Sequence, residues 1–279
     1  MTLLVTALLL LAALVHASWN AVVKGARDPV AMATCIYGTE AVLMLPLLIY
    51  SGPLPQSLWL LLAVHVVLHI VYKIALITMY QHGDLSQVYP VARGVAPLLV
   101  TVLAIPAAGE IPKGAALVGI ALISIGLLSF ALERSAIGRA RAKPLLLAAT
   151  AGVALSAYTV IDGLGVRTPG AALSYVGWIF VLDGAAMIVI GRIWRGDALY
   201  TALRVHARTG MALGAISCVN FCIVLWALSL AAMGPVVAVR ETSVVFAALI
   251  GAIFMGESFG IRRVAAAILI AAGIVFMNL

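Results

Sequence analysis

The sequence predicts an all-α polytopic membrane protein with ten transmembrane helices in two inverted five-helix repeats. Three observations predict it: an apolar composition, apolar runs of membrane-spanning length, and an internal repeat. Of the 279 residues, 65% are apolar and 10% are charged, with a mean hydropathy of +1.19. A soluble domain is about half apolar and roughly a quarter charged. This composition excludes a soluble enzyme, a disordered chain and a nucleic-acid-binding module.

Apolar runs separated by Gly, Pro and charge clusters give the predicted spans. A helix that crosses the bilayer needs about 20 mostly apolar residues. Ten such spans leave little sequence for loops and none for a soluble domain. They are residues 3–22, 31–50, 58–81, 86–107, 112–131, 144–163, 171–191, 209–231, 235–255 and 259–278.

The basic residues predict the orientation of the chain. Cytoplasmic loops of membrane proteins carry an excess of Lys and Arg. The loops on the opposite face carry only Lys113 and Arg167. A multi-pass protein of a bacterial-type inner (plasma) membrane, with both termini extracytoplasmic, is therefore expected. The basic residues of the predicted cytoplasmic face are Lys24, Arg27, Arg134, Arg139, Arg141, Lys143, Arg192, Arg195, Arg204, Arg208, Arg262 and Arg263.

The two halves of the chain resemble each other. Arg93 and Arg240 are 147 positions apart, and the same offset places Gly109-Glu110 on Gly256-Glu257 without a gap. An Arg and a Gly-Glu pair therefore recur at one fixed separation, which pairs the fourth span with the ninth. Internal repeats of this kind are a signature of duplicated architectures.

A second offset extends the repeat. Glu40 and Asp183 are 143 positions apart, which pairs the second span with the seventh. We assign the halves to residues 1–137 and 138–279. Because each half has an odd number of spans, the second must cross the bilayer in the opposite sense. Inverted repeats are a transporter architecture, with the substrate site near the midplane between the halves.

These features resemble the drug/metabolite transporter superfamily, in its EamA-type branch. The Tyr89-Pro90 opening of the fourth span and the two Gly-Glu endings are similar to that branch's pattern. The resemblance implies a ten-helix fold and export of amino acids, drugs or other metabolites, often against a proton gradient. The stretches 16–20 (HASWN) and 89–94 (YPVARG) look like a subgroup associated with phosphonate use.

Charged side chains within the spans are the strongest candidates for the site. Each costs roughly 2.5–3.5 kcal/mol near the bilayer centre, so it must be paired or face a wet cavity. Arg93 and Arg240 are equivalent in the repeat and suit a carboxylate or phosphonate; Glu40 and Asp183 are also equivalent and suit an ammonium group. Structural ion pairs between helices are the alternative. The six charges, three of each sign, are Lys73, Arg93, Arg240, Glu40, Asp183 and Glu241.

Polar and aromatic residues extend the predicted substrate site. Asn20 shares a polar stripe of the first span with His16, and Trp19 lies beside it. Trp19 and its counterpart Tyr158 are expected to wall the chamber, with Tyr89 on the same face of the fourth span as Arg93. A place in the aromatic belt at the membrane interface is the alternative for Trp19 and Tyr158.

Four residues are candidates for proton coupling: Glu241, Glu40, His16 and Lys73. Buried acids and histidines exchange protons near working pH. Glu241 breaks the repeat, since its counterpart is Gly94. Neighbours on a helix point about 100° apart, so Glu241 is not expected to pair with Arg240. A packing contact with Lys73 or His16 is the alternative.

The third span carries His65, His69 and Lys73 at four-residue spacing. The spacing permits a metal site or a proton relay. No carboxylate or thiolate lies on that stripe, however, so polar packing is favoured, and neither a metal nor a cofactor is expected. Pro97, one turn after Arg93, predicts a kink at the site.

The sequence therefore predicts a secondary transporter, not an enzyme, since nothing resembles a nucleotide-binding loop. The equal number of buried cations and anions favours a zwitterion such as an amino acid or aminophosphonate. A multidrug or amine cation exporter is the alternative, and a membrane-embedded lipid-modifying enzyme is less favoured. The expected partners are a small-molecule substrate and the lipid bilayer, without nucleic acid, in a monomer or weak homodimer.

Overall fold

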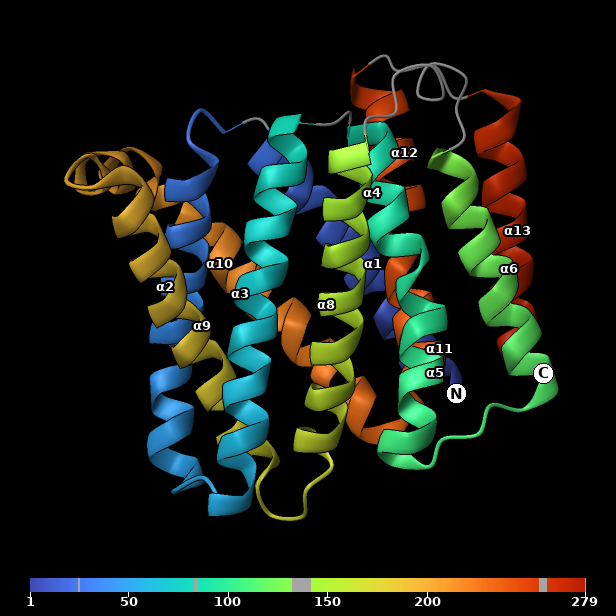
Figure 1. The fold of residues 1–279 in the computed structure, drawn as a ribbon, viewed down its shortest axis with the longest axis horizontal. Helices are drawn as coiled ribbons and strands as arrows, with labels where there is room; N and C mark the ends of the chain where they lie inside the picture. The colour runs from blue at the N-terminus through green and yellow to red at the C-terminus, as the bar shows by residue number, and fades with distance from the viewer. Residues whose placement is uncertain (25, 83–84, 132–141, 256–259, 279) are drawn as a thin grey trace.

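A computed structural model describes residues 1–24, 26–82, 85–131, 142–255 and 260–278, and in these ranges the chain is helical and has no strand (Figure 1). The helices are α1 (Leu3–Lys24), α2 (Pro29–Ser51), the short 3-10 helix Gln56–Leu58, α3 (Trp59–His82), α4 (Leu85–Gly94), α5 (Ala96–Ala108), α6 (Gly114–Ala131), α8 (Ala142–Val166), α9 (Ala172–Arg195), α10 (Ala198–Leu230), α11 (Met233–Glu241), α12 (Ser243–Met255) and α13 (Ile261–Met277).

The predicted spans correspond to these helices. Among the described residues, 8 helical segments are long and apolar enough to cross a membrane. The other two predicted spans correspond to α6 and α13, which are shorter, at 18 and 17 residues. The architecture is therefore consistent with ten crossings. The eighth span is longer than predicted, because α10 already begins at Ala198 and its first turns carry Arg204 and Arg208.

Two of the crossings are broken helices. The fourth is α4 followed by α5, interrupted at Val95, and the ninth is α11 followed by α12, interrupted at Thr242. These positions are 147 residues apart, the offset that relates Arg93 to Arg240. The kink predicted at Pro97 is therefore present, two residues earlier. The break cannot depend on proline alone, since the equivalent of Pro97 is Val244.

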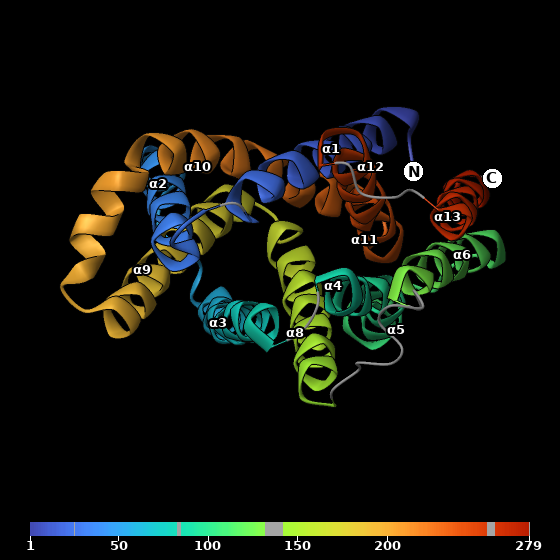
Figure 2. The same ribbon diagram turned by 90° about the horizontal axis from the view of Figure 1, so that it is seen from above.

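The helices form matching pairs from the two halves. α2 packs against α9, and α6 packs against α13. The third and sixth crossings, α3 and α8, pack together, and so do the equivalent eighth and first crossings, α10 and α1. Viewed from above, α6 and α13 lie together at one edge of the molecule, and α2, α9 and α10 lie at the other (Figure 2). The boundary predicted near residues 137 and 138 lies outside the described residues and stays a prediction.

Glycines allow α6 and α13 to touch. A Cβ atom on Gly119 would lie 2.5 Å from the carbonyl oxygen of Gly273, and one on Gly273 would lie 2.6 Å from that of Gly119. Gly126 meets Ile270 and the carbonyl of Ala266 in the same way. Small residues at these positions therefore let the two helix backbones approach closely.

The Gly-Glu motif of the first half joins two helix ends. Gly109 ends α5 with a φ of 67°, a left-handed conformation that favours glycine. Glu110 accepts a hydrogen bond from the backbone N–H of Met233 at 2.8 Å, at the start of α11, and pairs with Arg167 at 2.5 Å. Arg167 also donates to the carbonyls of Leu228 and Ala231 at the end of α10. The second copy, at residues 256–257, lies outside the described residues.

Candidate substrate site

One cavity inside the helix bundle collects the predicted site residues. It measures about 90 Å³ and is lined from α1, α2, α3, α4, α8, α9, α10 and α11. A buried water needs roughly 10–15 Å³, so this cavity accommodates a small molecule. All eight residues predicted for substrate binding line it: Arg93, Arg240, Glu40, Asp183, Trp19, Tyr158, Tyr89 and Asn20. A larger hollow of about 400 Å³ near Cys218 and Trp226 has no charged lining residue.

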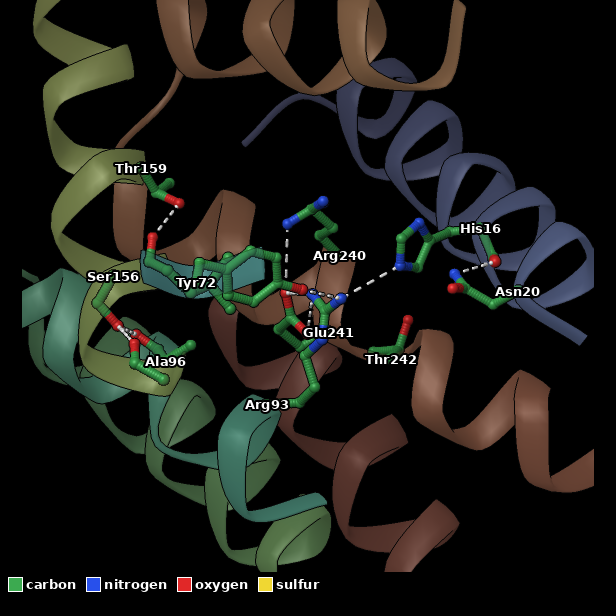
Figure 3. A network of polar contacts seen from close by, with 12 residues as sticks. His16, Asn20, Tyr72, Arg93, Ala96, Ser156, Thr159, Arg240, Glu241 and Thr242 are labelled. Atoms are coloured by element: carbon green, nitrogen blue, oxygen red, sulfur yellow. Dashed lines mark hydrogen bonds and ion pairs between the residues drawn. The ribbon is translucent and has the colours of Figure 1, made fainter. Parts of the chain in front are cut away.

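One side of the cavity is cationic (Figure 3). Arg93 donates from one terminal nitrogen to both carboxylate oxygens of Glu241, at 3.1 and 3.2 Å. Its other terminal nitrogen donates to the Tyr72 hydroxyl at 3.1 Å and lies 3.3 Å from His16 Nε2. Arg240 shares the same carboxylate at 3.5 Å. Glu241 is fully buried, so one acid holds two arginines inside the bundle.

The contact between Arg240 and Glu241 corrects the sequence prediction. Both residues lie in the last turn of α11, so their side chains still leave the helix in different directions. At this end the long Arg240 side chain reaches the carboxylate of its neighbour. The alternative packing partners, Lys73 and His16, are not paired with Glu241: His16 instead lies against Arg93, and Lys73 against Asp183.

The other side of the cavity holds a cluster of acids, histidines and a lysine. Asp183 on α9 lies 3.3 Å from Lys73 Nζ, forms a short hydrogen bond with His69 Nδ1, and lies 3.6 Å from His65 Nε2. Asp162 on α8 lies 2.6 Å from His65 Nδ1. Carboxylates on two other helices therefore meet the third-span stripe, although the stripe itself has none.

Asp162 also corrects the charge count. It is 1% exposed, so the described part of the chain buries four acids against the three cations Lys73, Arg93 and Arg240. The sequence places Asp162 one turn after Tyr158, near the end of its span. A regular helix pattern carried no signal that it would meet His65 on α3.

Glu40 differs from the other buried acids. It is 4% exposed and lines the cavity, yet within the described ranges no Lys, Arg or His lies within ion-pair distance of its carboxylate. Asp162, Asp183 and Glu241 each contact at least one such partner. Glu40 is therefore the buried carboxylate that is available to a cationic group in the cavity.

Aromatic rings and unsatisfied polar atoms complete the lining. Trp19, Tyr89 and Tyr158 line the cavity, as expected from the sequence, together with Tyr37 and Tyr72, which it did not single out. Five buried atoms of lining residues have no hydrogen-bond partner among the described residues. They are Trp19 Nε1, Arg93 Nε, Asp183 Oδ1, Asn220 Oδ1 and Arg240 Nε.

The model of the EamA-like transporter family matches residues 142–279. The chain belongs to the EamA-like transporter family, within the drug/metabolite transporter superfamily. A comparison with solved structures found 23 matching chains. One of them, described only as a crystal structure of a protein, is 17% identical, with a TM-score of 0.76 over 99% of this chain and 98% of the other. This likeness concerns the fold alone. No curated protein sequence matched the chain.

Membership in this family makes the chain a multi-pass membrane transporter. The matched part includes α9, which carries Asp183, and α11, which carries Arg240 and Glu241. The first half supplies Arg93 and Glu40 from α4 and α2. A cavity bounded by both halves is where transporters with inverted repeats hold their substrates.

Proposed function

We propose that this EamA-family protein is a gradient-driven exporter of a small zwitterionic metabolite, such as an amino acid or an aminophosphonate. One observation carries the proposal: the cavity presents opposite charges on opposite sides. Arg93, Arg240 and Glu241 together carry one surplus positive charge, and they lie on α4 and α11. Glu40 and Asp183 lie on α2 and α9, across the bundle in Figure 2.

The two sides suit the two ends of a zwitterion. A guanidinium offers parallel donors to a carboxylate or phosphonate, and Arg240 retains an unpaired Nε. The carboxylate of Glu40, which has no ion-pair partner among the described residues, suits an ammonium group. Because the protein's own charges are fixed before the substrate arrives, a substrate of matching polarity binds without leaving a buried charge unpaired.

Counterflow exchange in proteoliposomes tests this proposal. The assay compares three substrates: a neutral amino acid, the amine that lacks its carboxylate, and the acid that lacks its ammonium group. The zwitterion is expected to exchange fastest. Glu40→Gln is expected to abolish that exchange while Asp197→Asn, at an exposed carboxylate, leaves it unchanged. If the amine alone exchanges and Arg240→Gln has no effect, the zwitterion proposal fails.

A cation exporter is the second candidate, favoured by the aromatic lining. Lys73 Nζ lies 3.8 Å from the centre of the Tyr37 ring, so a cation already occupies one aromatic face beside the cavity. The two arginines of the same cavity disfavour a purely cationic substrate. The amine arm of the counterflow experiment distinguishes these candidates.

The pairing of the buried charges supports Glu40 as the residue for proton coupling in this proposal. Of the four residues predicted for coupling, Glu241, His16 and Lys73 are each held by a charged partner. Glu40 can lose and regain a proton without breaking an ion pair. Export from the cytoplasm through an inner membrane, with both termini extracytoplasmic, remains part of this proposal and depends on the loop charges.

A further inference from the structure

His65, His69 and Asp183 form a buried cluster whose ligand atoms face one another. One nitrogen from each histidine and one carboxylate oxygen all lie within 4.8 Å of one another. Both histidine nitrogens approach the same atom, Asp183 Oδ2. The residues belong to α3 and α9, so the cluster joins the two halves of the chain.

Several buried nitrogen and oxygen atoms of this cluster and its neighbours lack well-aligned hydrogen bonds. His65 has an exposure of 0%, yet neither of its ring nitrogens has a well-aligned hydrogen-bond partner among the described residues. The same is true of Lys73 Nζ, Asp162 Oδ1 and Asp183 Oδ1, although oppositely charged groups lie close by. Buried polar atoms in native proteins normally make well-aligned hydrogen bonds, whereas these atoms lie at ion-pair distance without that alignment, an arrangement that a ligand shared between them would satisfy.

The geometry fits a divalent transition metal. His65 and His69 are four residues apart on one helix face, which is a common zinc-ligand spacing. Zinc binds histidine nitrogen and carboxylate oxygen at about 2.0–2.2 Å, so tetrahedral ligand atoms are roughly 3.3 Å apart. His65 Nε2 and Asp183 Oδ2 are 3.6 Å apart. His69 and Asp183 are closer together and would separate slightly as the metal displaced the proton between them.

The surrounding groups match the outer shell of such a site. Histidine ligands usually present their second nitrogen to a carboxylate, and carboxylate ligands are in turn paired. Asp162 lies 2.6 Å from His65 Nδ1, which leaves Nε2 directed at Asp183. Lys73 lies 3.3 Å from Asp183 Oδ1, whereas both histidines approach Oδ2. Two carboxylates against one lysine give the cluster a surplus negative charge when the histidines are neutral.

We propose that His65, His69 and Asp183 bind a divalent transition metal of the Zn²⁺ class, with its fourth position directed toward the cavity. Imidazole ligands favour Zn²⁺, Co²⁺, Ni²⁺ or Cu²⁺ over Mg²⁺ and Ca²⁺. His69 and Asp183 line the cavity, which provides the entry path. The bound metal would tie α3 to α9 across the two halves. This inference does not depend on the identity of the transported substrate.

Cobalt spectroscopy tests the site. Full-length protein is purified in detergent without a polyhistidine tag, stripped with a chelator and titrated with Co²⁺ alone. The visible absorption bands of four-coordinate Co²⁺ are expected at one ion per chain and should be displaced by Zn²⁺. His65→Ala and His69→Ala are expected to raise the Kd at least about 100-fold, and Asp162→Asn about 10–100-fold. His206→Ala, on α10 and outside the cluster, is the matched control.

A variant that is expected to bind the metal more tightly distinguishes a change at the site from misfolding. Lys73→Met removes a positive charge next to Asp183, and it is expected to lower the Kd for Co²⁺ by about tenfold or more. Damaged folding would not produce this change. Three results would each overturn the proposal. They are the absence of the bands at saturating Co²⁺, an unchanged Kd in His65→Ala, and a raised Kd in Lys73→Met. An empty cluster that binds only protons gives the first of these results.

Discussion

The interaction of one acid with two arginines predicts an unequal response to substitution. Glu241 contacts Arg93 at 3.1 Å and Arg240 at 3.5 Å, and all three side chains are at least 90% buried. Glu241→Gln leaves both guanidinium groups without a counter-charge. Removing one partner of a buried ion pair typically costs about 3–5 kcal/mol. Arg93→Met instead leaves Arg240 paired with Glu241.

Arg93→Met is therefore expected to lower the free energy of unfolding by less than Glu241→Gln does. Arg93→Met loses the hydrogen bonds to Tyr72 and His16, which corresponds to about 1–3 kcal/mol. Each kcal/mol lowers the melting temperature of a chain of this size by roughly 2–4 °C. Glu241→Gln is expected to melt roughly 6–20 °C below the wild type, and Arg93→Met at an intermediate temperature.

Thermal unfolding in detergent measures this order, with a thiol-reactive dye that detects Cys218, which is 2% exposed in the folded protein. Asp197→Asn is the control, because Asp197 pairs with Arg192 at the exposed surface and such pairs contribute little. The reasoning is refuted if Glu241→Gln melts with the control, or if Arg93→Met melts below Glu241→Gln.

Further substitutions test the packing, the far end of the bundle and the coupling. Gly119→Ala is expected to destabilise the protein by roughly 1–3 kcal/mol, because its Cβ would meet a backbone oxygen; Gly114→Ala has open space and should melt like the wild type. Arg167→Ala is expected to cost roughly 1–3 kcal/mol in the same thermal assay, since it removes an ion pair and two bonds to carbonyls that end α10. Glu40→Gln is expected to abolish transport driven by an imposed pH gradient without lowering the melting temperature. A variant that still responds fully to the gradient would contradict coupling at Glu40.

The spans and the members of the cavity could be predicted from the sequence for specific reasons. A span is a local property, since about 20 apolar residues suffice to define it. The convergence of Arg93 with Arg240 and of Glu40 with Asp183 was accessible through the repeat, because equivalent positions of an inverted duplication face each other across its axis. For these residues, composition and internal similarity carry information about distant contacts.

The pairing of the buried charges could not be predicted in the same way. The Arg240–Glu241 contact depends on the conformations of two long side chains at neighbouring positions of α11, which the spacing along the helix does not specify. The contact between His65 and Asp162 depends on how α3 lies against α8, and nothing in the spacing along either helix encodes that register. Side-chain partners between helices therefore had to come from the structure.

The single acid between two arginines explains why the repeat is imperfect at this point. Gly94 occupies the position equivalent to Glu241, and a Cβ on Gly94 would lie 2.8 Å from the Leu128 side chain, so the first half has no room for a second acid there. With glycine at both positions, two buried guanidinium groups would face each other without a counter-charge. One Glu241 offsets one positive charge and leaves the other for a ligand. The repeat itself places the equivalent arginines on one side of the cavity and the equivalent acids Glu40 and Asp183 on the other; the break in symmetry at Glu241 lowers the charge of the cationic side from two to one.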